Sequence, residues 1–409
     1  MRIPALSIIF LFVFSILIDL YITLDIRQMW KKKGVVSWWI CCLLCYALLI
    51  VAISLPRRDA DAGISAVMWL LFIYLSIYAG KFIYFLCSVF GRFVRLAARI
   101  RWDWYPSRLV GAVLGAAFIG MMWIGAGYSR NHIMVVHEDF YSKKLPESFN
   151  GYRIVQLSDL HVGTWGNDTT FLSNLVDSVN SLQPDLIVFT GDIVNRASNE
   201  LVPFTSVLSR LQAKDGIYSI LGNHDYGDYL DWPTPRDKVD NMNQLKEYQR
   251  GMGWKMLNNE SVFIHNGNDS ILLIGVENWG EPPFPRYGDL DKSFPSDGKT
   301  HHSDNNYKVL LSHNPEHWNQ EISHNTNIDL TLSGHTHAMQ AMVKIGDFKW
   351  SPSKYRYEQW GGKYERENKD GDKTAIYVNI GSGAVGMPAR LLSAYPEITE
   401  ITLLRESER

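Results

Sequence analysis

Long apolar stretches dominate the first third of the chain. Four of them approach or exceed the roughly 20 residues that a helix needs to cross a bilayer. They lie near residues 4–24, 36–55, 64–90 and 108–128. We therefore predict a first domain, residues 1–130, with four transmembrane helices. A cleaved signal peptide is the alternative for the first stretch, but only Arg2 precedes it and no small-x-small cleavage site follows it.

Basic residues flank these stretches unevenly. They occur after the first stretch and after the third, at Arg27, residues 31–33, Arg92, Arg95, Arg99, Arg101 and Arg108. In the middle loop, Arg57 and Arg58 are offset by Asp59 and Asp61. The positive-inside rule then places the first and third loops in the cytoplasm. It predicts that residues 131–409 lie outside, on the periplasmic side of the inner membrane if the source is Gram-negative.

Two ionisable residues lie within the predicted membrane spans, Asp19 in the first and Lys81 in the third. Ionisable groups in hydrocarbon usually pair or face a polar cavity, and these two should lie at similar depths. We predict an Asp19–Lys81 ion pair that ties the two helices together. A functional relay and snorkelling of Lys81 are the alternatives.

From about residue 153, short runs rich in Val, Ile and Leu alternate with stretches of helical period, which predicts layered α/β structure. Five of the runs are followed directly by residues that commonly bind metals. These residues are Asp159 and His161, Asp192, Asn223, His313, and His335 and His337. Ligands in open α/β sheets bind at the carboxyl ends of strands, so we expect the five segments to converge on one site.

Other elements complete a second domain over residues 131–409. Helical spacing and terminus signals predict helices at 169–183, 203–213 and 239–250. Apolar runs predict further strands at 270–276, 339–344, 375–380 and 398–404. Residues 279–306 are rich in Pro, Gly, Asp and Asn and are expected to form a long loop over the site.

Charge and cysteine content narrow the function classes. Residues 1–130 hold 14 basic and 5 acidic side chains, whereas residues 131–409 hold 26 basic and 37 acidic ones. An acidic second domain argues against nucleic acid as a partner, because phosphate backbones require a basic surface. All four cysteines lie in the apolar first third, so the second domain offers neither a disulfide framework nor a thiolate zinc site.

The residues at the strand ends combine imidazole, carboxylate and one amide oxygen, a set that suits Mn, Fe or Zn. Seven ligands exceed what one tetrahedral ion needs, whereas two divalent ions about 3.5 to 4 Å apart that share a carboxylate would use all of them. Such a pair holds a phosphoryl group and lowers the pKa of a bridging water. The sequence therefore predicts hydrolysis of a phosphate ester through a metal-bridging hydroxide.

Five short motifs in order resemble the signature of the calcineurin-like metallophosphoesterases. They are Asp-x-His, Gly-Asp-x-x-Asn, Gly-Asn-His-Asp, a lone His after a strand, and Gly-His-x-His, within residues 153–405. Residues 155–161, 311–316, 388–391 and 396–398 further resemble the membrane-anchored, YkuE-type branch of that family. The resemblance implies a four-layer α/β/β/α sandwich with mixed sheets behind the transmembrane region.

The resemblance also implies individual roles. The first ion would be held by Asp159, His161, Asp192 and His337, and the second by Asp192 as the bridge with Asn223, His313 and His335. His224 resembles the family's histidine that contacts the phosphate and protonates the leaving oxygen.

Asn195 departs from the family pattern, because many relatives have an Asp there that orients the histidine corresponding to His224. Either His224 acts as a neutral or water-linked donor, or Asp225 or another carboxylate takes the orienting role. Asn195 and Arg196 are candidate substrate contacts, and a nearby ion pair is the alternative for Arg196.

Other histidines and aromatic residues lack the strand-end pattern. We expect His265, His317 and His324 to be ordinary loop or strand residues, and His301 and His302 to lie in a solvated loop. Aromatic residues crowd the segment after the Gly-His-x-His motif, at Phe348, Trp350, Tyr355, Tyr357, Trp360 and Tyr364. We expect this segment to pack on itself, with contact to the membrane surface or a lipid chain as the alternative.

These inferences favour a membrane-anchored, extracytoplasmic, two-metal phosphoesterase. Its substrate would be a lipid-linked or envelope phosphate or pyrophosphate, with membrane lipids as partners. Similar pyrophosphohydrolases of lipid A precursors have a cytoplasmic nucleotide-linked substrate, which the predicted orientation disfavours. The alternative is a non-catalytic membrane sensor or scaffold with a metal-bound phospho-ligand-binding domain. A transporter with a regulatory domain has little support from one Asp/Lys pair and short loops. The sequence does not specify an oligomeric state.

Overall fold

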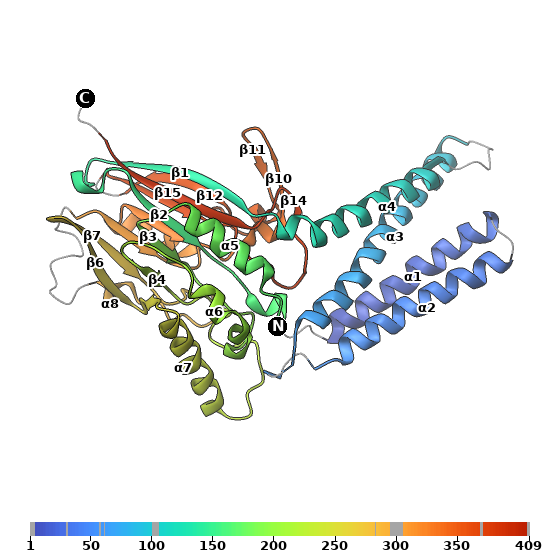
Figure 1. Ribbon diagram of the computed structural model, residues 1–409. Coiled ribbons are helices and arrows are strands. Elements are labelled where there is room, and N and C mark those ends of the chain that lie inside the picture. Colours follow the sequence, from blue (N-terminus) through green and yellow to red (C-terminus); the bar gives the residue numbers. More distant parts are fainter. Residues whose placement is uncertain are drawn as a thin grey trace. The chain divides into compact units, whose positions relative to one another are not determined.

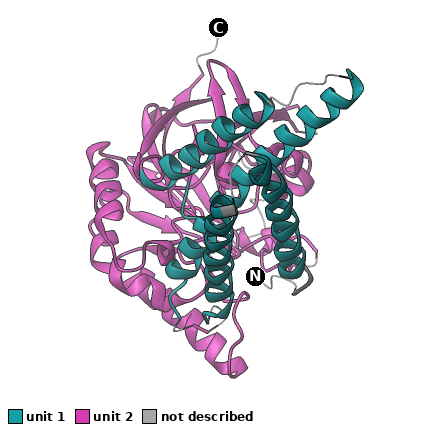
Figure 2. Cartoon of the chain, turned by 90° about the vertical axis from the view of Figure 1, so that its right-hand side faces the viewer, with its two compact units in different colours: residues 1–58, 62–127, 386–389 teal, residues 59–61, 128–385, 390–409 magenta. Residues whose placement is uncertain are grey.

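The computed structural model describes residues 5–29, 32–56, 59–60, 62–99, 106–282, 284–294, 306–368 and 371–406. Two compact units make up the chain, and Figure 2 colours them separately. Unit 1 comprises residues 1–58, 62–127 and 386–389, and unit 2 comprises residues 59–61, 128–385 and 390–409.

Unit 1 is built from four apolar helices, each long enough to cross a membrane. They are α1 (Ala5–Met29), α2 (Lys32–Ser54), α3 (Ser65–Ala97) and α4 (Pro106–Gly127). The four predicted spans are thus confirmed as helices, although α1 and α3 continue past their predicted ends. Small residues let α3 and α4 pack closely, because a Cβ atom at Gly115 would lie only 2.6 Å from the carbonyl oxygen of Gly80.

The predicted ion pair in unit 1 is confirmed. The Lys81 ammonium lies 2.8 Å from Oδ1 of Asp19. The hydroxyls of Tyr46 and Tyr78 donate to Oδ2 of the same carboxylate at 2.5 and 2.7 Å. Asp19 is fully buried, so these three donors compensate for the loss of water around its charge.

A second buried carboxylate, Asp25, corrects the expected positions of two cations. Arg92 and Arg108 were expected in the loop between the third and fourth spans, but they lie on α3 and α4 and both bind Asp25. Ser88 also donates to Asp25, at 2.6 Å. The apolar run of the first span ends before Asp25, whereas the helix does not, because partners on α3 and α4 hold the carboxylate. Arg57, Arg58, Asp61 and Arg101 lie outside the described residues.

Unit 2 contains two six-stranded mixed sheets. The first has the order β1 (Met134–Ser142), β15 (Glu397–Arg405), β2 (Tyr152–Leu157), β3 (Leu186–Phe189), β4 (Ile217–Ser219), β5 (Lys255–Met256). The second has the order β12 (Gly362–Glu367), β13 (Lys373–Val378), β9 (Leu330–Ser333), β8 (Lys308–Leu311), β7 (Asp269–Gly275), β6 (Glu260–Asn266). A small third sheet joins β11 (Phe348–Trp350), β10 (Ala341–Ile345) and β14 (Leu391–Leu392).

Strand alternation divides the core of unit 2 into layers. In β3, Leu186 and Val188 pack between the two large sheets, whereas Ile187 and Phe189 pack beneath the helices. Those helices are α5 (Thr170–Ser181), α6 (Thr205–Leu208) and α7 (Pro235–Gly251), which cover the first sheet in Figure 1. The outer face of the second sheet packs on Trp318 and Ile322, near the short α8 (Leu290–Ser293) and α9 (Ser323–Asn325). The expected four-layer α/β/β/α sandwich is confirmed.

One predicted helix is wrong in part. Residues 203–213 were expected to form a single helix, but a 3₁₀ segment at Ser198–Phe204 is followed by only one turn of α-helix in α6. The hydroxyls of Thr205 and Ser209 donate to the carbonyls of Val202 and Ser206, which is the local competition that disfavours a longer helix. β1, β5, β6, β11, β12 and β14 were not anticipated.

Candidate metal centre

The strand ends converge as the alternating pattern predicts. β2, β3 and β4 run parallel in the first sheet, and β8 and β9 run parallel in the second. Their carboxyl ends present two compact groups of ligand atoms, each within 4.8 Å of one another. One group is Asp159, His161 and His337, and the other is Asp192, His313 and His335.

Asp192 lies between the two groups. Its Oδ2 atom is 3.2 Å from Nε2 of His313 in its own group and 3.6 Å from Nε2 of His161 in the other. The side-chain oxygen of Asn223 lies 3.2 Å from Nε2 of His313. One carboxylate that reaches both groups is the arrangement that a pair of cations sharing a ligand requires.

The donor atoms fit divalent cations. Nε2 of His161 lies 3.0 Å from Nε2 of His337, and Nδ1 of His335 lies 3.2 Å from Nε2 of His313. Imidazole nitrogens that face one another beside carboxylate oxygens place several lone pairs in a small buried space. A shared cation satisfies all of them, whereas a proton satisfies only one pair. The absence of sulfur favours Mn, Fe or Zn over softer ions.

The protonation states match this chemistry in most of the cluster. Burial lowers the pKa of His335 to about 3 and holds the pKa of His161 well below its usual value, so both imidazoles are neutral, as metal ligands must be. Burial also acts to lower the pKa of His313, but the carboxylates of Asp192 and Asp159 outweigh it and raise this pKa to about 9. His313 therefore releases a proton when a cation binds.

Hydrogen bonds orient three of the imidazoles. Nδ1 of His313 lies 2.7 Å from the carbonyl oxygen of Thr190, which leaves Nε2 for a cation. Nε2 of His335 lies 3.0 Å from the hydroxyl of Tyr357, which leaves Nδ1 directed at the cluster. Nδ1 of His337 lies 3.5 Å from Nη2 of the buried Arg390.

Asp225 holds the loop that carries Asp192. Its carboxylate is fully buried and accepts the backbone N–H groups of residues 192, 193, 194 and 222 at distances of 2.9 to 3.2 Å. This removes Asp225 from the orienting role suggested by the sequence, because its oxygens bind backbone amides rather than His224.

Backbone strain is concentrated at the cluster. Five of the seven predicted ligands have a positive φ angle, and none of them is glycine: Asp159, His161, Asp192, His335 and His337. Each such residue costs on the order of 1 kcal/mol or more, and the conformation persists only where the surrounding structure enforces it. Close packing contributes here, because a Cβ atom at Gly334 would lie 2.3 Å from Oδ2 of Asp159.

His224 lies beside the cluster. Its ring centroid is 4.8 Å from that of His161, and its backbone N–H donates to Oδ1 of Asp192 at 2.8 Å. Nδ1 of His224 lies 2.7 Å from the backbone carbonyl oxygen of Asn195. The side-chain amide of Asn195 donates instead to the hydroxyl of Thr164. The group that Nδ1 of His224 contacts is therefore the backbone carbonyl of Asn195, and not a carboxylate.

The structure does not bring every candidate to the cluster. Nε of Arg196 lies 3.2 Å from a carboxylate oxygen of the buried Glu200, so Arg196 forms the ion pair that was the alternative, and its contact with substrate stays a prediction. His317 is buried against Ser312 and Glu321, and His265 lies on β6. His301 and His302 lie outside the described residues.

Three residues at the site were missed by the sequence reasoning. Tyr229 packs against His224 with ring centroids 4.5 Å apart and ring planes tilted by 33°, and its hydroxyl accepts from the Asn223 amide at 2.8 Å. Tyr357 and Arg390 contact His335 and His337. Tyr357 was considered only as part of the aromatic segment, and Arg390 only as part of the resemblance near residue 388. No spacing rule links such residues to ligands that are distant in sequence.

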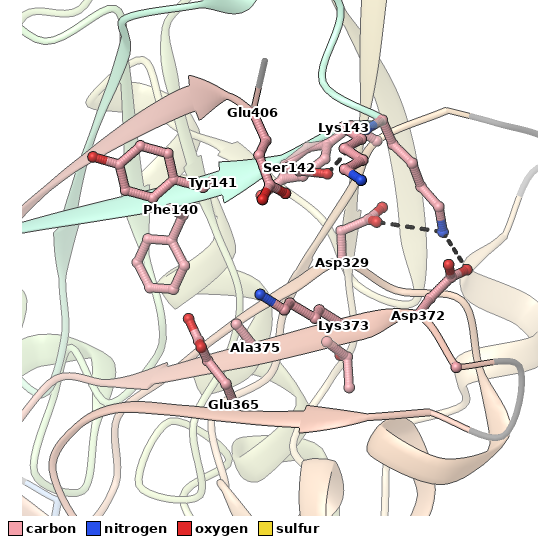
Figure 3. Close-up of a pocket in the computed structure, with 14 residues that line it drawn as sticks. Phe140, Tyr141, Ser142, Lys143, Asp329, Glu365, Asp372, Lys373, Ala375 and Glu406 are labelled. Atoms are coloured by element: carbon pink, nitrogen blue, oxygen red, sulfur yellow. Dashed lines mark hydrogen bonds and ion pairs between the residues drawn. The ribbon is translucent and has the colours of Figure 1, made fainter. Parts of the chain in front are cut away.

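A separate cavity of about 630 Å³ lies at the opposite ends of the strands. Figure 3 shows Asp329, just before β9, and Asp372 at this cavity. The Lys144 ammonium lies 3.7 Å from a carboxylate oxygen of Asp329 and 2.7 Å from one of Asp372. The metal-type cluster lies at the carboxyl ends of β8 and β9, whereas this cavity lies at the amino ends of β9 and β13. Its lining carries both acidic and basic side chains, and Lys144 pairs with Asp329 and Asp372.

Comparison with known proteins gives the same picture. Residues 152–339 match the calcineurin-like phosphoesterase family. The chain is 32% identical to a zebrafish (Danio rerio) transmembrane protein with a metallophosphoesterase domain, over 66% of this chain and 57% of that protein. It is 28% identical to the uncharacterised metallophosphoesterase YkuE of Bacillus subtilis, over 71% of this chain and 94% of YkuE. It is also 28% identical to the UDP-2,3-diacylglucosamine pyrophosphatase LpxG of Chlamydia muridarum, over 54% of this chain and 74% of LpxG.

Proposed function

Residues 152–339 form a calcineurin-like metallophosphoesterase domain, and we propose from this premise that the chain is a membrane-anchored, two-metal phosphohydrolase. The observation that carries the proposal is the position of Asp192, whose carboxylate approaches a histidine from each of the two ligand groups. Asp159, His161, Asp192 and His337 would hold one divalent ion, and Asp192, Asn223, His313 and His335 the other. When bound, such ions neutralise phosphoryl oxygens and lower the pKa of water, so that hydroxide is available at neutral pH.

The residues around the cluster support turnover rather than binding alone. His224 lies next to His161, and the Asn195 carbonyl accepts a hydrogen bond from its Nδ1–H. With one proton held on Nδ1, the neutral ring leaves Nε2 free to take up a second proton and then to give it to the leaving oxygen. Tyr229 packs against the same ring and limits its rotation.

The substrate class follows from the anchor. The chain is a membrane protein with four apolar helices, and two of its relatives are transmembrane proteins. A tethered site meets lipid head groups at high effective concentration, which favours a lipid-linked or envelope-derived phosphate or pyrophosphate. The relative LpxG is a pyrophosphatase whose substrate carries acyl groups, which supports this class.

The catalytic domain is proposed to face the extracytoplasmic side. Arg92 and Arg108 bind Asp25. The basic residues Arg95 and Arg99 near the third loop, together with Arg27 and the lysines at residues 31–33 near the first loop, support cytoplasmic first and third loops. Alkaline phosphatase and green fluorescent protein fused in turn to the C-terminus test this. If the green fluorescent protein fusion is fluorescent and the alkaline phosphatase fusion is inactive, the domain lies in the cytoplasm instead.

Hydrolysis itself is tested with the purified full chain. With Mn²⁺ it should cleave a p-nitrophenyl phosphate monoester or diester, and Asp192→Asn should abolish this activity. Asp177→Asn is the matched control, because Asp177 is an exposed residue of α5 away from the cluster. Activity that survives Asp192→Asn would reject the two-metal mechanism. Metal binding and phosphate binding without turnover would instead support the sensor or scaffold function.

A further inference from the structure

The β10–β11 hairpin has an unusual distribution of side chains. Val343 pairs with Trp350 and Ile345 pairs with Phe348 directly across the two strands, so all four lie on one face. Lys344 pairs with Lys349 on the other face. The hairpin, with β14, stands apart from the two large sheets in Figure 1.

The apolar face of the hairpin points away from the core of unit 2. Met342 alternates with Val343 along β10 and is buried against Trp360 and Ile380, so its face is the inner one. The opposite face carries Ile345 and Phe348, whose side chains are 72% and 60% exposed. A hairpin on a soluble surface normally shows polar residues on its outer face, so this reversed pattern marks a surface that meets an apolar medium.

Charge around the hairpin identifies that medium. Between residues 341 and 357, four cations accompany a single acidic residue, Asp347. Lys344, Lys349 and Lys354 are exposed, and the Lys354 ammonium lies over the ring of the exposed Tyr355. Apolar side chains flanked by lysines and a tyrosine are the composition that enters the boundary between head groups and acyl chains of an anionic bilayer. An apolar surface that binds another protein would not need these cations around it.

The hairpin is also connected to the metal-type cluster at both of its ends. The chain enters β10 four residues after His337 and, beyond β11, reaches Tyr357, whose hydroxyl contacts His335. A hairpin anchored in a bilayer therefore positions the cluster at the lipid head groups. Four spanning helices in the same chain keep that bilayer close.

We infer that the β10–β11 hairpin inserts Ile345 and Phe348 into the surface of an anionic bilayer, and that the cluster acts there on a phosphate or pyrophosphate carried by a membrane lipid. The second half of this inference rests on the proposed function. The first half concerns binding alone, and the experiment separates the two.

Insertion is measured with a fluorophore on the full chain in lipid nanodiscs. An environment-sensitive dye is attached at Ile345→Cys, and the same dye at Val239→Cys, an exposed position on α7, is the control. The parent chain, which has four native cysteines in unit 1, gives the background. Nanodiscs contain phosphatidylcholine with or without phosphatidylglycerol, and lipids with a nitroxide quencher in the acyl chain.

The dye at position 345 should lose most of its emission to the nitroxide, more strongly with phosphatidylglycerol, while the dye at position 239 should not. Lys344→Glu with Lys349→Glu should remove the dependence on phosphatidylglycerol. Equal, weak quenching at both positions would overturn the inference. The inference would also be overturned if the dye at position 345 became protected from water in detergent and this protection rose with protein concentration. A second copy of the chain would then cover the apolar face of the hairpin.

Turnover supplies the second readout. Ile345→Asp with Phe348→Asp should leave hydrolysis of the soluble p-nitrophenyl ester unchanged and should abolish most hydrolysis of phosphatidic acid or its diacylglycerol pyrophosphate presented in nanodiscs. Equal rates of the variant and the parent on the bilayer probes would reject the role of the hairpin in substrate access. If the dye at position 345 is quenched but the protein hydrolyses none of the esters, insertion of the hairpin is supported and the proposed function is rejected.

Discussion

Nδ1 of His224 lies 2.7 Å from the backbone carbonyl oxygen of Asn195. A main-chain acceptor is insensitive to the side chain that the residue carries. We therefore expect Asn195→Ala to retain most of the activity on a p-nitrophenyl ester, whereas His224→Ala lowers kcat by about 10²- to 10⁴-fold, the usual contribution of a general acid. Steady-state kinetics at constant Mn²⁺ measures both. Equal losses in the two variants would mean that the Asn195 side chain itself is required.

Asp225 supports the Asp192 loop through four backbone amides. Asp225→Ala leaves these buried donors without a partner, and each lost bond to a charged acceptor costs about 1.5 to 3 kcal/mol. We expect a clear fall in the unfolding temperature and a loss of bound metal by elemental analysis. Asp240→Ala, at an exposed position of α7, should change neither quantity. An unchanged metal content in Asp225→Ala would contradict this role.

Tyr357 holds His335 by a hydrogen bond from outside the cluster. Tyr357→Phe removes the hydroxyl that lies 3.0 Å from Nε2 of His335 and leaves the ring in place. Loss of such a partner typically lowers metal affinity by about 10- to 100-fold. A Mn²⁺ titration monitored by isothermal calorimetry provides the measurement. Tyr355→Phe, at a 78% exposed position two residues earlier, is the matched control and should bind Mn²⁺ like the parent.

Asp329 should make the stability of unit 2 depend on pH. Burial raises the pKa of this carboxyl to about 6, although the backbone N–H of Lys308 and the Lys144 ammonium oppose the shift. A folded-state pKa above the unfolded one means that the native state binds more protons between about pH 4 and 6, so this group's contribution to stability is full at low pH and is lost as the pH rises.

Asp329→Asn removes that titration. Between pH 4 and pH 7, the free energy of unfolding of the variant should rise relative to that of the parent by up to about 3 kcal/mol. This corresponds to a shift of about two pKa units. Denaturant unfolding of the full chain in detergent at several pH values gives the difference. Asp372→Asn alters the half-exposed carboxylate that pairs with Lys144 and is labelled in Figure 3, and it should show no comparable trend. A parallel pH profile for the parent and Asp329→Asn would contradict the raised pKa.

The strand-end ligands could be predicted from the sequence because their signal is local. Runs such as Leu186–Phe189 are buried on both faces and therefore continuously apolar, and the residues that follow them are carried to the sheet edge. The same reasoning missed β1, because it is an edge strand whose side chains are mostly half-buried or exposed. Its apolar run, residues 133–136, is short and is followed by the polar residues 137–139.

The supporting residues could not be predicted, because their roles depend on distant contacts. Arg390 is fully buried by five backbone carbonyls as far back as residue 380, and nothing in its neighbourhood in the sequence indicates this. Asp25 and Arg108 are far apart in the chain and meet only when α1 and α4 pack on α3. The contact between Asn195 and His224 could not be predicted either, because family comparison considers side chains, whereas this contact involves a backbone carbonyl.

The position of β15 between β1 and β2 has a consequence for synthesis. β1 begins shortly after α4 and pairs only with β15, among the described strands, while β15 also forms the ladder with β2. The first sheet therefore stays open on one side until residues 397–405 have left the ribosome. Unit 2 therefore cannot complete its first sheet before that segment is available, and a nascent chain held by its membrane helices must be kept from aggregating until then.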